Sequence, residues 1–598
     1  MLQIAGWAIP VGAAAAVASW LLLRLIGLIT NAVFYQRLAT GLVAPGGVRH
    51  PAPLVLLAPV VGGLVVGLLA RFGSEKIRGH GMPEAIEAIL TGGSRVAPRV
   101  AVLKPISAAV SIGTGGPFGA EGPIIMTGGA VGSMLAQLLR LSADERKTLL
   151  VAGAAGGMAA TFNSPLAAVL LAVELLLFEW RPRSFVPVVV ATVMATVVRG
   201  PLLGTAAIFA VSTAGSRLTA GDDALCLITG LTGGLLAIGA TALVYVSEDL
   251  FARLRTHWMW WPAIGGLIIG IGGLIEPRAL GVGYDVIDQL LTGRATISLI
   301  VGILVVKTLI WALALGSGTS GGVLAPMFMV GGALGALEGT VFPSVFPGFW
   351  AMIGLAAVVG GVMRSPLTGV VFTLELTHAW NTVLPLLVGS CAAYALSTLV
   401  LKRSVLTEKI ARRGLHLTRE YSTDPLEAFL ASDVLDPDAR VLESGARVAE
   451  VGLPAADPQR LYPVLAGGRL CGVVPAARLR TAARDALVSS LAVERPVVVY
   501  ADDTLRHVAN VFAEHRISRA PVVSRQDEGQ LLGLIALADL LTARLHDLTE
   551  EHHRQRHLLA GPARRLPAVR RRSRKRRSVR SVRLVRSVRS PKRRSMTS

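Results

Sequence analysis

The sequence predicts an all-α, multi-pass membrane domain with broken helices and an inverted repeat, followed by a small α/β domain pair. Hydrophobic residues make up 52% of the 598 residues and charged residues only 16%, which is too apolar for an ordinary soluble enzyme. A glycine-rich segment recurs about 200 residues later, and polar residues with strand-like alternation begin after residue 415. We therefore expect a transmembrane domain over residues 1–415, an α/β pair over 424–548 and a basic tail over 549–598.

The first domain contains apolar runs of unequal length. Residues 1–23 contain no charged side chain and lack the basic start and cleavage site of a signal peptide, so they predict a retained membrane helix. Several later runs fall short of the roughly 20 residues that span a bilayer. Short, Gly/Pro-interrupted apolar segments indicate broken helices whose freed backbone groups face protein or a watery cavity. These later runs are 52–70, 185–198, 225–247, 295–306 and 349–363.

An internal repeat divides this domain into two homologous halves. GTGGPFGAEGPIIMTGGAVG at 113–132 matches GSGTSGGVLAPMFMVGGALG at 316–335. FNSPLAAVLLAVELL at 162–176 matches MRSPLTGVVFTLELT at 363–377. Such halves are commonly related by inverted topology, and the substrate site then lies near the membrane midplane, where broken helices from both halves meet.

The repeated segments have the chemistry of an anion site. Pro123 and Pro326 suit the first turn of a helix, and the preceding glycines leave backbone N–H groups open to close approach. A helix N-terminus carries roughly half a positive charge, so it attracts an anion more weakly than Lys or Arg does. Fast passage requires such weak binding. The alternative, that the glycines only permit tight helix packing, explains GGAVG and GGALG better than GAEGP and GVLAP.

Three motifs, in order, resemble the signature segments of the CLC chloride channel and transporter family. They are GHGMP, GAEGP and GVLAP, and the neighbouring GTGG, GSGTSGG and SPL segments also match. The resemblance covers nearly all of residues 1–415. It implies passage of chloride or a similar monovalent anion, in a homodimer with one pore per subunit. It also implies that the anion contacts Gly79, His80, Gly81, Met82, Pro83, Gly119, Ala120, Gly122, Pro123, Gly322, Val323, Leu324, Ala325 and Leu406.

Glu121 is the expected gate. An ionisable group within an apolar membrane segment is costly, so it indicates function by default; the alternative is a buried structural carboxylate. Its partner in the repeat is Leu324, so internal symmetry does not require the acid. In the family, this carboxylate competes with the permeant anion for a site and swings aside once protonated. Proton binding and anion passage would thereby be linked.

The chain departs from the family at three positions that tune selectivity or proton coupling. His80 replaces a pore serine, and its imidazole could donate to an anion and titrate near neutrality, or be a neutral histidine with no special role. Leu406 replaces a pore tyrosine, which removes a hydroxyl donor and predicts a looser or purely apolar inner gate. Leu175 replaces an internal proton-transfer glutamate. A channel or weakly coupled transporter is therefore expected, with strict chloride/proton antiport as the alternative; Glu174 or His80 could substitute as the proton site.

Two lysines and two glutamates recur at matching positions in the halves. Lys104 and Lys307 could raise the electrostatic potential around the pore, but pairing with carbonyls, or with a carboxylate such as Glu375, is the favoured interpretation. Glu174 and Glu375 end apolar helical runs, and a structural role is favoured for both.

The second domain contains two similar units. Residues 461–480 and 519–541 each show a strand hairpin followed by a helix, and residues 495–517 add a strand and a helix. This pattern resembles a pair of CBS domains, a regulatory module often attached to CLC proteins.

The resemblance raises the question of an adenine nucleotide as ligand. CBS domains can bind one through a G-x-x-[ST]-x-x-D segment whose Asp holds the ribose. The second copy keeps Gly533 and Asp539 but has Ala536 at the Ser/Thr position, and the first copy keeps only the glycine, Gly472. Packing and dimer contact are therefore favoured over nucleotide binding.

The net charge of +21 lies mainly in the tail. Residues 564–594 hold 16 of the 59 basic residues and no acid, which leaves 43 bases against 38 acids elsewhere. The tail has the low-complexity composition of a disordered segment. The positive-inside tendency predicts that it is cytoplasmic, where a solvated disordered tail is favoured over attraction to anionic lipid headgroups; no nucleic-acid partner is expected.

Other function classes find little support. No catalytic triad, metal-ligand cluster or phosphate-binding loop occurs in the sequence, and the three cysteines lie far apart, so we expect no enzyme, metal or disulfide. A transporter for a larger organic anion would need an aromatic or polar pocket, whereas aromatics are only 5% of the chain. A nucleic-acid or lipid tether built on the tail is a third alternative.

Overall fold

The computed structural model describes residues 1–90, 93–213, 218–412, 426, 429–452, 459–542 and 545. These residues form two compact units divided near residue 419. The first unit is helical and the second contains two small mixed sheets, which confirms the predicted fold class. The expected boundaries at 415 and 424 and the basic tail lie outside the described residues.

The first half of the helical unit begins with a long apolar helix, α1, as the sequence predicted. Pro10 lies inside this helix, which nevertheless continues without a break over all 34 residues. The π-helical segment η2 follows α7 directly and contains Glu174. The elements of this half are α1 (Leu2–Tyr35), α2 (Ala52–Phe72), η1 (Glu75–Ile77), α3 (Met82–Leu90), α4 (Pro98–Gly113), α5 (Glu121–Leu138), α6 (Ala143–Phe162), α7 (Pro165–Ala172), η2 (Val173–Leu177) and α8 (Pro182–Leu203).

The second half repeats the first with local differences. A π-helical segment here interrupts the helix that corresponds to α4, whereas α16, the counterpart of α7, stays α-helical to its end. The elements are α9 (Ala220–Ala252), η3 (Trp258–Trp260), α10 (Trp261–Ile275), η4 (Pro277–Ala279), α11 (Tyr284–Leu291), α12 (Ile297–Gly302), η5 (Ile303–Lys307), α13 (Thr308–Gly316), α14 (Leu324–Glu338), α15 (Phe349–Met363), α16 (Pro366–Thr377), η6 (Trp380–Thr382), α17 (Val383–Val400) and α18 (Thr407–Arg412).

Helix lengths agree with a multi-pass membrane domain built partly from short helices. Within the described residues, 7 helical stretches are long and apolar enough to cross a bilayer. Four apolar helices of 10–17 residues are shorter than that: Pro165–Leu177, Leu324–Glu338, Phe349–Met363 and Pro366–Thr377. Short helices of this kind leave helix ends within the protein, where they can face a site.

Corresponding helices of the two halves pack against each other. α2 lies against its counterpart α10, and α7 against its counterpart α16. The α2–α10 contact is itself symmetric, because a Cβ atom on Gly63 would lie 2.1 Å from the Pro262 carbonyl oxygen, and one on Gly266 would lie 2.2 Å from that of Pro59. Gly63 corresponds to Gly266 and Pro59 to Pro262, each at an offset of 203 residues. The glycines therefore allow the two backbones to approach closely across a pseudo-two-fold axis.

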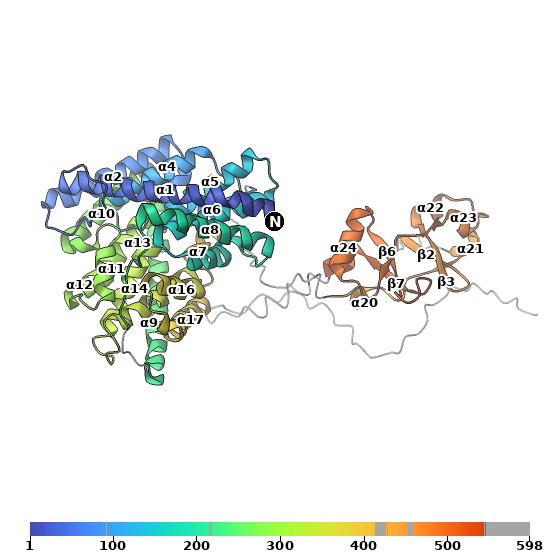
Figure 1. Ribbon diagram of the computed structural model, residues 1–598. Coiled ribbons are helices and arrows are strands. Elements are labelled where there is room, and N and C mark those ends of the chain that lie inside the picture. The colour runs from blue at the N-terminus through green and yellow to red at the C-terminus, as the bar shows by residue number, and fades with distance from the viewer. Residues whose placement is uncertain are drawn as a thin grey trace, which may run out of the picture. The chain divides into compact units, whose positions relative to one another are not determined.

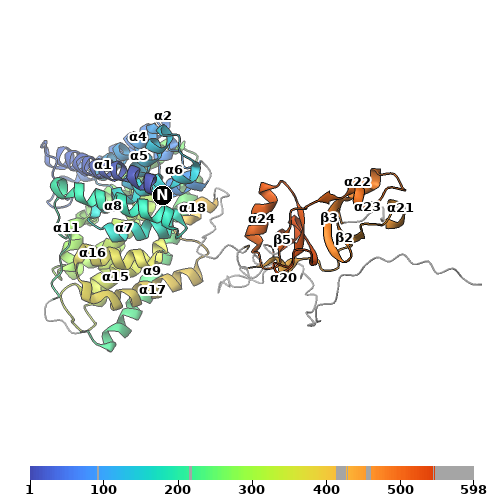
Figure 2. The same ribbon diagram turned by 45° about the vertical axis from the view of Figure 1, so that its right-hand side comes forward.

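The packing inside each half is also repeated. α5 packs on α6 and α1 on α8, and their counterparts α14 on α15 and α9 on α17 do the same. In Figures 1 and 2 the helices of the first half, blue to teal, gather on one side of the unit, and those of the second half, green to yellow, on the other. α7 and α16 lie at the boundary between them. The axis thus passes through the middle of the helical unit.

The second unit contains two sheets of like topology. In each, a short strand pairs in parallel with the first strand of an antiparallel hairpin. This duplication is the arrangement expected for a CBS pair. The strands are β1 (Leu442–Glu443), β2 (Leu461–Ala466), β3 (Arg469–Pro475), β4 (Val493–Glu494), β5 (Val499–Tyr500), β6 (Arg519–Val523) and β7 (Leu531–Ala536), and the helices are α20 (Ala431–Val434), α21 (Val448–Val451), α22 (Ala476–Thr481), α23 (Val488–Leu491) and α24 (Leu505–Glu514).

Candidate functional site

The repeated glycine segments of the two halves meet on the pseudo-two-fold axis. Gly322 donates its N–H to the Gly119 carbonyl at 2.7 Å, and Gly119 donates to the Gly322 carbonyl at 3.4 Å. The pair forms an antiparallel bridge between residues that are 203 positions apart. Because the bridge joins equivalent residues running in opposite directions, it indicates inverted halves. α5 and α14 begin two residues beyond it, at Glu121 and Leu324.

The GHGMP segment lies against both of the other motifs. Gly79 donates its N–H to the Gly318 carbonyl at 3.2 Å and accepts one from Gly321 at 3.4 Å. A Cβ atom on Gly122 would lie 1.8 Å from the His80 carbonyl oxygen. The three predicted segments therefore converge, and every residue of 79–83, 119–123 and 322–326 is buried.

The Glu121 carboxylate lies on the N-terminus of α14. Its Oε1 accepts N–H groups from Leu324 and from Ala325, the latter at 3.3 Å, and the residue is only 1% exposed. A Cβ atom on Gly119 would lie 1.8 Å from Oε2, and one on Gly322 would lie 2.2 Å from Oε1. The two bridging glycines thus leave the space that the carboxylate fills. A negative group occupies the site that free helix amides offer to an anion.

The two buried lysines hold glycine loops in place. Lys104 Nζ donates to the carbonyls of Ile77 and Gly79 at 2.8 and 2.6 Å. Lys307 Nζ donates in the same way to Ala279 and Gly281, also at 2.8 and 2.6 Å. Both side chains are fully buried. The structure therefore supports carbonyl pairing, one of the two alternatives that the sequence offered.

The contacts of Lys307 reveal a fourth segment, which the three sequence motifs did not indicate. Residues 281–285, GVGYD, correspond to GHGMP, and Gly281 and Gly283 match Gly79 and Gly81 at an offset of 202. Gly281 donates its N–H to the Gly115 carbonyl at 3.1 Å, just as Gly79 donates to Gly318. Two matching glycines were the only signal in the sequence, which is weak because glycine is frequent throughout this domain.

Glu174 and Glu375 cap helices of the opposite half. The Glu375 carboxylate accepts N–H groups at the start of α7, from Leu166 at 3.0 Å and Ala167 at 2.8 Å. Glu174 Oε2 accepts the N–H of Thr368, at the start of α16, at 3.0 Å and also its hydroxyl. Each acid satisfies otherwise free N–H groups, so the predicted structural role fits both. Leu175 is buried.

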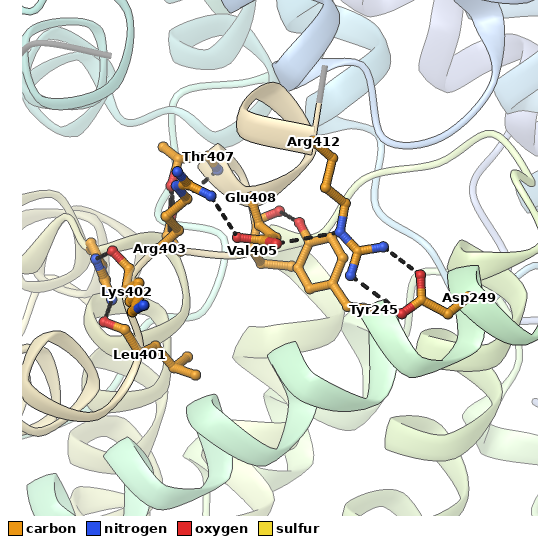
Figure 3. Close-up of polar contacts among 11 residues, drawn as sticks. Tyr245, Asp249, Leu401, Lys402, Arg403, Val405, Thr407, Glu408 and Arg412 are labelled. Atoms are coloured by element: carbon orange, nitrogen blue, oxygen red, sulfur yellow. Dashed lines mark hydrogen bonds and ion pairs between the residues drawn. The ribbon is translucent and has the colours of Figure 1, made fainter. Parts of the chain in front are cut away.

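Leu406 lies in the same hydrophobic core as the motifs, one residue before α18. Its neighbour Val405 accepts a hydrogen bond from the Tyr245 hydroxyl. Figure 3 shows Arg412 of α18 facing Asp249, with the closest N–O distance 2.6 Å. Leu406 therefore sits on a segment that is anchored at both ends to α9.

A charged cavity of about 540 Å³ opens beside the GHGMP loop. Its walls come from η1, α3, α9 and α18, and Lys409 and Glu84 form an ion pair at 3.4 Å within it. The charged lining residues are Glu75, Lys76, Arg78, Glu84, Glu87, Glu248, Asp249, Lys409 and Arg412. Water and small ions can thus reach Arg78, the residue before this loop, from this side.

The candidate nucleotide residues of the second unit have structural contacts. Gly533 lies in β7, where a Cβ atom would be 2.5 Å from the Asp436 carbonyl oxygen. Asp539 Oδ2 accepts the Ala536 N–H at 2.8 Å, and burial raises the pKa of this carboxyl. In the described part of the chain, no group of three His, Cys, Asp or Glu residues could hold a metal ion.

Comparisons with known proteins agree on one family. The family model described as voltage gated chloride channel matches residues 62–398, and the CBS domain model matches residues 488–546. A Citrobacter koseri protein named H(+)/Cl(-) exchange transporter ClcA is 33% identical over 367 residues, which are 58% of this chain and 76% of that protein. A Ralstonia nicotianae protein named putative chloride channel protein ClcB-like is 28% identical, over 60% of this chain and 85% of that one.

Solved structures share the fold. A slow cyanobacterial Cl-/H+ antiporter superposes with a TM-score of 0.60 at 23% identity, covering 69% of this chain and 98% of that one. A eukaryotic CLC transporter gives a TM-score of 0.58 at 19% identity, covering 90% and 98%. With the inverted halves, the converging glycine motifs and a family model that spans more than half of the chain, the protein belongs to the voltage gated chloride channel (CLC) family.

Proposed function

We propose that this protein passes chloride or a similar monovalent anion across a membrane, with Glu121 as the protonation-controlled gate. The observation that carries the proposal is the Glu121 carboxylate on the first amides of α14. These amides would attract an anion in the absence of the carboxylate, because they are the free N–H groups of a helix N-terminus.

Competition for the amides links protons to anion passage. The ionised carboxylate is held by the helix N-terminus, whereas the neutral acid loses that attraction and vacates the site. An anion then meets amides in place of a fixed positive charge, so it binds weakly enough to leave. The buried lysines are engaged with carbonyls and support the loops around this path.

Anion flux from liposomes tests the gate. Wild-type flux should rise as the pH falls, whereas Glu121→Gln should give flux that is high and independent of pH, because the neutral amide mimics the protonated acid. Asp144→Asn, a change at an exposed residue outside the charged cavity, serves as the control and should keep the wild-type profile. A pH profile unchanged in Glu121→Gln would refute the gate.

Strict chloride/proton antiport is the second candidate. Relatives are named H(+)/Cl(-) exchange transporters, which favours it, whereas the leucine at position 175 favours a channel or a weakly coupled transporter. Chloride and proton fluxes measured together under an imposed chloride gradient separate the two. Uphill proton movement would establish antiport, and its absence a passive pathway.

We further propose that the protein is a homodimer in the cell membrane with its second unit in the cytoplasm. The multi-pass helical unit supports an integral membrane protein, and the relatives named above are channels and exchangers rather than enzymes. The structural contacts of Gly533 and Asp539 support packing over nucleotide binding for the CBS pair.

A further inference from the structure

Tyr284 lies where a glycine loop of the second half meets a helix. It ends the glycine loop 281–284 and is the first residue of α11. In the repeat it corresponds to Met82, the first residue of α3. The first half therefore presents a methionine at this position, and the second half a phenol.

The Tyr284 hydroxyl and one carboxylate oxygen of Glu121 are alike in their burial and in their lack of hydrogen bonds among the described residues. Both the hydroxyl and Glu121 Oε2 are buried, and neither has a hydrogen-bond partner within the described part of the chain. Buried polar groups are nearly always paired, so such atoms call for an explanation. Glu121 is also a charged group that interacts electrostatically with the phenol.

Packing places the helix that begins with Tyr284 against α14, the helix that binds the gate. The Tyr284 ring makes an edge-to-face contact with Phe209, with ring centroids 5.9 Å apart. α11 packs on α14, the helix whose first amides bind Glu121. Gly283, immediately before Tyr284, abuts Met329 of α14, since a Cβ atom there would lie 2.5 Å from the sulfur. The start of α11, which carries the phenol, therefore packs against α14, the helix whose amides bind the carboxylate.

A cavity of about 130 Å³ reaches this phenol from the GVGYD side. Its lining includes Thr30, Ala44 and all five residues of the GVGYD segment. The larger charged cavity borders the corresponding GHGMP loop through Arg78 and Gly318. The pseudo-two-fold axis relates these two loops, and each loop borders one of the two cavities.

The other two charged groups considered near Tyr284 are either hydrogen-bonded or exposed. Lys307 lies 3.8 Å from the position of a Cβ atom on Gly283, but its ammonium group donates to two carbonyls. Asp285 is exposed. Of these three charged groups, Glu121 is the one with a buried oxygen that has no hydrogen-bond partner among the described residues.

We propose that the Tyr284 hydroxyl receives the Glu121 carboxylate when the latter leaves the amides of α14, and so holds the gate open. The inference rests on the proposed gating role of Glu121. At neutral pH a permeant anion that competes for the α14 amides displaces the ionised carboxylate, which then needs a donor, and the phenol supplies one without a positive charge that would trap it. Tyr284 would thus be a positioning residue for the gate.

Tyr284→Phe tests this inference, because it removes the hydroxyl and keeps the ring. At neutral pH, where the displaced carboxylate is charged, chloride flux should fall roughly tenfold, the effect expected for one hydrogen bond to a charged group. At acid pH, flux should stay within about twofold of wild type, because the neutral acid depends less on the donor. Tyr35→Phe is the matched control: the Tyr35 hydroxyl donates to the Ala44 carbonyl at 2.7 Å beside the same cavity, and its loss should leave the pH profile unchanged.

A double variant separates this inference from the gate itself. In a Glu121→Gln background, Tyr284→Phe should have no effect at any pH. If Glu121→Gln behaves as a pH-independent pathway while Tyr284→Phe matches wild type, the inference fails and the gate stands. If Tyr284→Phe lowers flux equally in both backgrounds, the hydroxyl serves the anion or the fold, and the inference also fails. Thermal unfolding in detergent, unchanged in the single variant, shows that the fold is intact.

Discussion

At the scale of residues, Gly119 and Gly322 decide whether the Glu121 carboxylate can reach the amides of α14. The carboxylate fills the space that a side chain on either glycine would need. Glycine at these positions therefore serves close approach by an acid from the same chain, in addition to close approach by an anion. The repeat accounts for glycine at both positions. A side chain at either one would displace the Glu121 carboxylate.

Gly322→Ala should therefore release the gate. The added methyl carbon would lie 2.2 Å from Oε1, which no rotation of the short alanine side chain relieves, so the carboxylate must leave the α14 amides. Chloride flux from liposomes at neutral pH should rise toward that of Glu121→Gln, and its pH dependence should largely disappear. Gly6→Ala is the control, because nothing lies within 4 Å of a Cβ atom there. A wild-type pH profile in Gly322→Ala would mean that the carboxylate does not need this position.

Single residues differed in how well the sequence revealed them. Glu121 could be predicted, since a carboxyl group in an apolar run is too costly to be accidental. Tyr284 could not, because a tyrosine in a membrane helix costs little and is frequent near interfaces. Its importance depends on an unpaired hydroxyl and on the neighbouring α14, and both are properties of the folded chain.

At the scale of elements, the short helices α7 and α16 are completed by acids from the opposite half. Glu375 caps α7, and Glu174 caps α16. These paired caps tie the halves together at their boundary, where the two helices pack on each other. A helix end left without partners inside a membrane protein would carry several unsatisfied N–H groups.

Removing the Glu375 cap should destabilise the protein. Glu375→Ala leaves the N–H groups of Leu166 and Ala167 without their acceptors, so we expect a loss on the order of 3 kcal/mol in the free energy of unfolding. Glu375→Gln keeps one acceptor and should cost about 1 kcal/mol. Thermal unfolding in detergent measures both, and Glu75→Gln should leave the midpoint unchanged. Equal midpoints for Glu375→Ala and wild type would show that water or other groups replace the cap.

The repeat predicted elements better than contacts between them. Helix starts near Pro123 and Pro326 followed from proline and glycine placement, and the structure confirms them. The cross-half caps could not be predicted, because a linear repeat does not tell which half a side chain reaches. The π-helical segments Val173–Leu177 and Ile303–Lys307 each occur in one half only, so symmetry gave no indication of them.

At the scale of the whole molecule, each unit has its own internal connections. In the first, α18 is fixed by the ion pairs of Lys409 with Glu84 and of Arg412 with Asp249. In the second, Arg469 of β3 donates to Asp527, in the loop before β7, at 2.6 Å, and so joins the two sheets. This hydrogen bond lowers the pKa of Asp527, so the pair is intact at neutral pH and is lost only as the pH falls through that lowered value.

The helical unit should therefore pass anions without the second unit. A chain ending at residue 419 keeps the two ion pairs that fix α18, because their acidic partners, Glu84 and Asp249, lie in the same unit. Chloride flux per protein should stay within about threefold of full length, since contacts of an intact unit are largely independent of distant ones, and Glu121→Gln should still remove its pH dependence. Deletion of residues 562–598 alone separates the basic tail from the CBS pair and should leave flux unchanged. If the 1–419 chain unfolds at the same temperature as the full-length protein but loses flux, the second unit takes part in anion passage. If removal of residues 562–598 alone abolishes flux, a tethering role of the tail is favoured as the main function of the protein.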